Sequence, residues 1–163
     1  MHEGDPHYQM IWRYYGTRLA ARSGVPLMSH IDEGLVILAA LGASLAARRA
    51  FCLHPILQCG GALDGPVDPE AEALAVEYVK VANETLSTRP IASAEEIRLS
   101  EVPEVNDMLI ADKVQNRKDF ERYHEATHPR SAALARYFRL WLARLGVSEA
   151  RYQELVALIS SSR

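Results

Sequence analysis

One stretch of the chain, residues 108–120, combines the apolar content of a buried helix with polar side chains that such a helix rarely carries. Its sequence is MLIADKVQNRKDF. Asp112 and Asn116 stand four residues apart, so they project from the same face of a helix. Burying a carboxylate and an amide without partners is costly. The segment therefore predicts a largely buried helix that presents these two side chains to a metal ion or a polar ligand.

Apolar residues recur at helical spacing through nearly the whole chain, and Gly and Pro separate the segments. No strand pattern, repeat or low-complexity tract is evident. The sequence predicts a single all-α domain, residues 1–163, built as a bundle of about seven helices. The expected helices cover residues 8–22, 29–42, 44–54, 69–83, 103–126, 130–145 and 149–159, with a short helical turn from residue 93.

Capping residues and prolines set several of the expected helix ends. Ser44 is a typical N-cap residue, and Ser29 with Asp32 has the spacing of a capping box. Pro55 lies inside an apolar run. Because proline lacks a backbone N–H and clashes with the preceding turn, we expect a kink or a stop at His54.

The composition is that of an ordinary globular protein, with 48% hydrophobic and 24% charged residues. A formal net charge of −3 gives no reason to expect a nucleic-acid partner. We expect the basic residues of the C-terminal half to form a solvated surface. They are Arg117, Lys118, Arg122, Arg130, Arg136, Arg139 and Arg144.

Targeting signals are not evident in the sequence. The polar N-terminal segment predicts no signal peptide, and no apolar run approaches the roughly 20 residues of a membrane span. Cys52 and Cys59 are seven residues apart and are expected to be free thiols. Together these features predict a cytoplasmic protein without a membrane partner.

Two histidines accompany Asp112 as potential metal ligands, and the three residues fall on three separate expected helices: His30, His54 and Asp112. Two imidazoles and one carboxylate can bind Mn, Fe or Zn and leave coordination positions open for water and a substrate oxygen. Ligands from three helices have no fixed sequence spacing. The alternative, in which both histidines are hydrogen-bonded core residues, therefore stays open.

Three segments, PLMSHIDEGLVIL, AFCLHPIL and LIADKVQNRKDF, occur in this order. They resemble the hydrolase domain of the RelA/SpoT family, which belongs to the HD-domain phosphohydrolases. The resemblance covers residues 25–120 and is most specific at residues 110–116. It implies an HD-type helical bundle in which His30, His54 and Asp112 hold one divalent metal, with Mn first and Zn or Fe as alternatives.

The resemblance also implies a substrate and its contacts. The substrate would be a phosphorylated nucleotide such as (p)ppGpp, with His54 and Asp112 in the catalytic centre and Asn116 shaping the nucleotide site. Arg18 and Arg22 lie near the His30 segment and could receive phosphate. Glu84 ends a helix at a place where related hydrolases line the nucleotide cleft with acids. The two arginines would equally suit a solvated helix edge.

The chain departs from the family pattern at three positions. Pro55 replaces the metal-binding Asp, and Gln58 and Cys59 replace the Glu-Asp pair that handles the attacking water. Two hypotheses follow: a metal-dependent nucleotide phosphohydrolase with a remodelled site, or a degenerate module that binds a nucleotide or a protein without turnover. A homo-oligomer is compatible with both. Acids that could substitute if loops bring them in are Asp32, Glu33 and Asp64.

Residues 124–128 spell HEATH, which matches the H-E-x-x-H signature of zinc proteases. Glu149 could serve as a third ligand. However, Pro129 disfavours helical geometry at His128, and the motif falls at a junction between two expected helices. We therefore interpret His124 as a residue of a polar helix end.

Two further sets of side chains have simple expected positions. Lys113 and Arg117 flank Asp112 and are expected to face solvent or a subunit partner. Aromatic residues at helical spacing are expected to pack in the core. They are Tyr137, Phe138 and Trp141.

Overall fold

Seven α-helices and one short 3₁₀ helix form the regular structure of residues 3–160, the part of the chain that the computed structural model describes. The predicted all-helical bundle is confirmed. None of these helices combines the length and the apolar content that a bilayer span requires. The helices are α1 (Pro6–Tyr15), α2 (Met28–Ala40), α3 (Leu45–Gln58), α4 (Pro69–Glu84), η1 (Ala94–Glu96), α5 (Pro103–Tyr123), α6 (Ser131–Arg144) and α7 (Glu149–Ser160).

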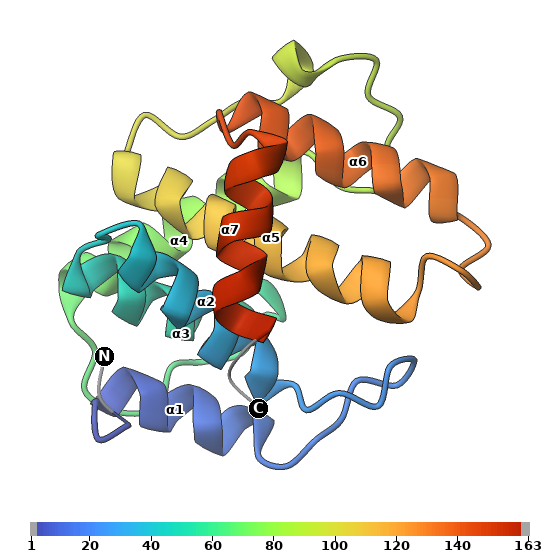
Figure 1. The fold of residues 1–163 in the computed structure, drawn as a ribbon. Helices are drawn as coiled ribbons and strands as arrows, with labels where there is room; N and C mark the ends of the chain where they lie inside the picture. Colours follow the sequence, from blue (N-terminus) through green and yellow to red (C-terminus); the bar gives the residue numbers. More distant parts are fainter. Residues whose placement is uncertain (1–2, 161–163) are drawn as a thin grey trace.

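Helix α5 is the central element of the bundle. It runs through the middle of the molecule and contacts α2, α3, α4, α6 and α7 (Figure 1). Its apolar residues Met108, Leu109 and Val114 are fully buried, as the sequence predicts. Because α5 is covered on several sides, polar side chains on it must find partners inside the protein.

Helix α1 ends much earlier than its apolar pattern predicts. Gly16 has a φ of 56°, a conformation that glycine adopts easily, and the helix stops at Tyr15. The following segment folds back on itself through an isolated bridge between Leu19 and Pro26. The predicted helix through residue 22 is therefore wrong, and a loop leads from α1 to α2 instead.

The predicted start of α2 is also wrong. The helix begins at Met28 and its N-cap, Leu27, makes no side-chain capping bond. Asp32 instead accepts a hydrogen bond of 2.7 Å from the Tyr8 hydroxyl of α1. The predicted capping residue Ser44 does cap α3, where its hydroxyl accepts from the backbone N–H of Ala47.

Helix α3 continues through Pro55 to Gln58, so the predicted stop at His54 is wrong. Proline leaves the carbonyl four residues earlier, that of Phe51, without its usual backbone donor. The His54 side chain supplies a replacement, because its Nδ1 lies 2.6 Å from the Phe51 carbonyl oxygen. The His54 imidazole thus replaces the backbone hydrogen bond that Pro55 cannot make.

Gly34 provides a close contact between α2 and α3, and we predict that Gly34→Ala destabilises the protein. An added Cβ would lie 2.1 Å from Cε1 of Phe51. Phe51 is fully buried and packs on both His30 and His54, so its ring cannot move away freely. Overpacking should lower the free energy of unfolding by about 1–3 kcal/mol, despite the better helix propensity of Ala.

Urea unfolding of Gly34→Ala tests this contact. The double variant Gly34→Ala with Phe51→Leu should recover part of the lost stability relative to Phe51→Leu alone, because the smaller side chain makes room for the methyl group. Wild-type stability of Gly34→Ala would contradict the close packing of the two helices.

Candidate metal centre

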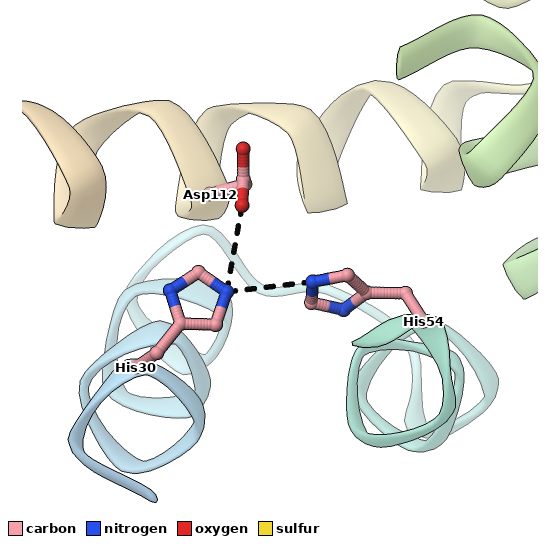
Figure 2. A group of neighbouring side chains, drawn as sticks. All are labelled: His30, His54 and Asp112. Atoms are coloured by element: carbon pink, nitrogen blue, oxygen red, sulfur yellow. Dashed lines mark hydrogen bonds and ion pairs between the residues drawn. The ribbon is translucent and has the colours of Figure 1, made fainter. Parts of the chain in front are cut away.

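Three potential metal ligands converge from three helices. His30 comes from the first turn of α2, His54 from α3 and Asp112 from the middle of α5, and their side chains point toward one another (Figure 2). Nε2 of His30 lies 3.4 Å from Nε2 of His54 and 3.4 Å from Oδ1 of Asp112. One ligand atom from each residue lies within 4.8 Å of the other two.

This spacing fits a divalent metal ion. Nitrogen and oxygen ligands bind Zn²⁺ and similar ions at about 2.1 Å, so two ligands in a tetrahedral arrangement are about 3.4 Å apart. The separations from Nε2 of His30 to Nε2 of His54 and to Oδ1 of Asp112 both have this value. Three protein ligands also leave coordination positions open for other molecules.

The tautomer of His54 is fixed by its own helix. Its Nδ1 faces the Phe51 carbonyl oxygen, which can only accept a hydrogen bond, so the proton belongs on Nδ1. The unprotonated Nε2 is then directed at His30 and Asp112. Pro55 leaves that carbonyl without a backbone donor, so this proline helps to orient a candidate metal ligand.

The tautomer of His30 is fixed by a polar network on α5. Its Nδ1 lies 2.7 Å from Oε1 of Gln115. The Gln115 amide nitrogen donates to Glu33 at 3.0 Å and to Asp119 at 2.8 Å, so the amide oxygen must face His30. Buried Lys118 pairs with both carboxylates at 2.6 and 2.7 Å. Outer partners of this kind commonly orient metal-binding histidines.

The charges at the centre favour a bound cation. Burial, followed by the neighbouring His30, lowers the pKa of His54 to about 3. Burial raises the pKa of Asp112, but Lys113 and the two histidines outweigh it and lower that pKa to about 2. A neutral imidazole and a carboxylate therefore direct lone pairs into the same small space. A positive ion between them would remove this repulsion.

The second oxygen of Asp112 is occupied by a buried lysine. Nζ of Lys113 lies 2.9 Å from Oδ2 of Asp112 and 3.4 Å from the hydroxyl of Tyr137. It also lies 4.9 Å from the centre of the Trp141 ring. The expectation that Lys113 faces solvent is therefore wrong. Its position leaves Oδ1 of Asp112 as the oxygen that faces the histidines.

Arg117 is also buried, against the expectation from sequence. Its guanidinium donates to Glu121 at 2.6 Å and to both oxygens of Glu149 at 2.8 Å, and it lies 3.8 Å from the centre of the Tyr152 ring. Lys118 is inside the protein as well. Both residues were predicted to belong to a solvated basic surface. Arg117 instead joins α5 to α7, and Lys118 joins α5 to α2.

A cavity of about 340 Å³, here called the site cavity, opens onto the three ligands. Its walls come from the loop after α1 and from the inner faces of α2, α3 and α5. Asn116, which stands on the same helix face as Asp112, lies in this wall, and so do Pro55, Gln58 and Cys59. Tyr137, Phe138 and Trp141 are buried in the core, also as predicted.

The other predicted phosphate contacts lie outside the wall. Arg18 is exposed and donates to the carbonyls of Tyr14 at 2.5 Å and Tyr15 at 3.1 Å. Arg22 is exposed on the loop, and Glu84 forms an ion pair with Arg98 at the end of α4. None of Arg18, Arg22 and Glu84 lines the site cavity.

Asp119 is the acid that sequence reasoning missed. It lines the site cavity, whereas the three proposed substitutes Asp32, Glu33 and Asp64 do not. Asp119 follows Asp112 by seven residues, which is about two helical turns and returns to the same face. This seven-residue spacing is the feature of the sequence from which Asp119 could have been predicted to face the same site as Asp112.

The H-E-x-x-H segment does not form a metal site in the structure. Residues 124–128 follow the end of α5 as a turn, in agreement with the expected helix junction. Nδ1 of His128 accepts from the backbone N–H of Arg130, and Glu149 pairs with Arg117. Among the described residues, His30, His54 and Asp112 are the group whose ligand atoms lie close enough to share an ion.

Comparisons with known proteins give no family for this chain: no protein-family model, no curated protein and no solved structure matches it.

Proposed function

We propose that this protein is a metal-dependent phosphohydrolase of the HD type, with a remodelled site that acts on a phosphorylated nucleotide. The observation that carries the proposal is the convergence of Nε2 of His30, Nε2 of His54 and Oδ1 of Asp112 at the site cavity. The order of the three motifs and their resemblance to the RelA/SpoT hydrolase domain support a phosphorylated nucleotide as the substrate class.

His30, His54 and Asp112 would hold one divalent ion, with Mn first and Zn or Fe as alternatives. Such an ion supplies Lewis-acid activation of water for attack on phosphorus. The protein supplies fixed imidazole tautomers, through Phe51 and Gln115, so that the ligands need not reorganise.

Side chains of the cavity wall supply the remaining chemistry. Asn116 and Gln58 carry amide N–H groups that can donate to phosphate oxygens. Apart from Asp112, Asp119 is the carboxylate in the wall, and it would accept the proton released when water attacks. The P–O bond to the leaving group then breaks, and the products are a phosphate and an alcohol or a shorter phosphate.

A second candidate function is nucleotide binding without turnover. It is favoured by the composition of the wall, in which Pro55, Gln58 and Cys59 stand where the family places acids. Within the described part of the chain, no Lys or Arg lines the site cavity. A phosphate could then bind through the ion and the amides, while water activation would depend on Asp119 alone.

The decisive experiment is hydrolysis of ppGpp and a panel of ordinary nucleotides by the purified protein with added Mn²⁺, resolved by anion-exchange chromatography. We expect turnover that a chelator abolishes and that His54→Gln loses. His128→Gln is the matched control, because His128 is a histidine outside the metal centre, and it should keep activity.

Failure of the hydrolase proposal has two distinguishable forms. Mn²⁺-dependent nucleotide binding without product would favour the binding module. Absence of Mn²⁺, Zn²⁺ and Fe²⁺ binding by the wild-type protein would contradict both candidate functions, because both rely on the same three ligands.

A further inference from the structure

A second cavity, here called the arginine cavity, lies between the loop after α4 and the N-terminal half of α6. Its volume is about 270 Å³. Figure 1 shows the long connection from α4 through η1 passing along α6. Three arginines line the arginine cavity: Arg89 from the loop, Arg130 at the N-cap of α6, and Arg136 from α6 itself.

Two of these arginines are held in place by the loop that they face. Arg130 donates to the backbone carbonyl of Ser87. Arg136 donates to the carbonyls of Ile91 and Ala92, the latter at 2.5 Å. A guanidinium carries five N–H donors, so each of these side chains keeps further donors for another acceptor. The loop thus orients the positive charges without neutralising them.

Among the residues that the structure describes, no Asp or Glu lines the arginine cavity. Within residues 3–160, none of its three arginines takes part in an ion pair, although Arg49, Arg98 and Arg117 elsewhere all do. The nearby carboxylate of Glu96 is engaged with the backbone N–H of Ala92. In a protein with net charge −3, three unpaired arginines around one hollow favour a negatively charged ligand.

The start of α6 adds to the positive potential. Its N-cap residue, Arg130, makes no side-chain capping bond, and Ala133 of the first turn lines the cavity. The positive end of a helix dipole attracts anions. Tyr137 also lines the cavity, but its hydroxyl donates to the backbone carbonyl of Thr85 at 3.3 Å, so the positive charge of the wall comes from the arginines and the helix start.

We propose that the arginine cavity binds a phosphate group, either as free phosphate or as a phosphate monoester. Guanidinium groups commonly bind phosphate through two parallel N–H···O hydrogen bonds. A volume of about 270 Å³ is at the small end of ligand pockets, which suits one phosphate group better than a whole nucleotide. The proposal is independent of the proposed hydrolase activity.

The arginine cavity is separate from the metal centre. Tyr137 lines it, and the Tyr137 hydroxyl is 3.4 Å from Nζ of Lys113, which in turn pairs with Asp112. Lys113 therefore lies between the two sites, and no residue lines both cavities. Phosphate binding here should not require a metal.

Isothermal titration calorimetry with inorganic phosphate, in the presence of a chelator, tests the proposal. We expect one site whose affinity falls about tenfold in Arg89→Gln, because a charged hydrogen-bond partner is lost. Arg89 is the preferred variant since Arg130 and Arg136 also hold the loop. Arg122→Gln, an exposed arginine on α5, is the matched control and should bind like the wild type.

A parallel titration with adenosine 5′-monophosphate distinguishes the two sources of the phosphate. Tighter binding than inorganic phosphate, with the same loss in Arg89→Gln, assigns a monoester, and weaker binding assigns free phosphate. Equal phosphate affinity in the wild type, Arg89→Gln and Arg122→Gln would overturn the proposal. So would the absence of binding to the wild type, even if an acidic peptide bound to this face.

Discussion

Asp112→Asn should lower the affinity for Mn²⁺ by more than about 100-fold and abolish the metal-dependent hydrolysis that we propose. Loss of an outer partner of a metal ligand commonly costs 10–100-fold in affinity, and loss of the ligand charge itself should cost more. Asp112 is the one carboxylate of the candidate metal centre, and its low pKa, about 2, keeps it charged at neutral pH. Asparagine keeps the shape but removes the charge.

Metal binding is measured by the loss of the free Mn²⁺ signal in electron paramagnetic resonance, with circular dichroism to check helical content. Asp107→Asn is the matched control, because Asp107 is a carboxylate of the same helix that neither lines the site cavity nor belongs to the three candidate ligands. It should retain Mn²⁺ affinity. Wild-type Mn²⁺ affinity in Asp112→Asn would remove the basis for a metal at this position.

The ends of several helices could be predicted because local chemistry decides them. Ser44 and Asp68 cap α3 and α4 through bonds to residues two or three positions ahead. Pro103 begins α5, and Gly146, with a φ of 75°, follows α6. Such signals are complete within a few residues, so the sequence alone contains them.

Other features depended on partners that local patterns do not reveal. The apolar spacing after Tyr15 is helical, but Gly16 ends α1 and the chain folds back. Pro55 predicts a helix stop, yet the His54 side chain satisfies the carbonyl that proline leaves free. At Pro55 a side-chain hydrogen bond outweighs the helix-breaking effect of proline, whereas at Gly16 the glycine ends the helix although the apolar spacing continues.

One part of the candidate site could be predicted from the sequence, and another part could not. The motif order identified His30, His54 and Asp112, and the structure brings them together. Their supporting residues were not predictable, because Gln115 reaches His30 across 85 residues of sequence. Lys113 is adjacent to Asp112 in sequence, but its burial depends on aromatic rings of α6. Sequence patterns thus selected three candidate ligands that lie together, whereas the packing around them could be seen only in the structure.

Lys113→Met should produce the largest loss of stability, about 3–5 kcal/mol in the metal-free protein. Lys113 and Asp112 form a buried ion pair at 2.9 Å, with side chains that are 8% and 7% exposed. Removing one partner of such a pair leaves an uncompensated buried charge. Methionine fills a similar volume among Tyr137 and Trp141, so the loss of charge rather than a cavity dominates the effect.

Two measurements distinguish an electrostatic cause of the destabilisation in Lys113→Met from a packing defect: the effect of added Mn²⁺ and the effect of a second substitution. A divalent ion at the metal centre would neutralise Asp112, so Mn²⁺ should stabilise Lys113→Met more than it stabilises the wild type in urea unfolding. The double variant Asp112→Asn with Lys113→Met should be more stable than Lys113→Met alone, because neither charge remains buried.

Lys80→Met, which changes an exposed lysine of α4, is the control and should shift the free energy of unfolding by no more than about 0.5 kcal/mol. If Mn²⁺ stabilised Lys113→Met and the wild type equally, the ion would not be compensating the charge of Asp112, and its assignment to this centre would fail.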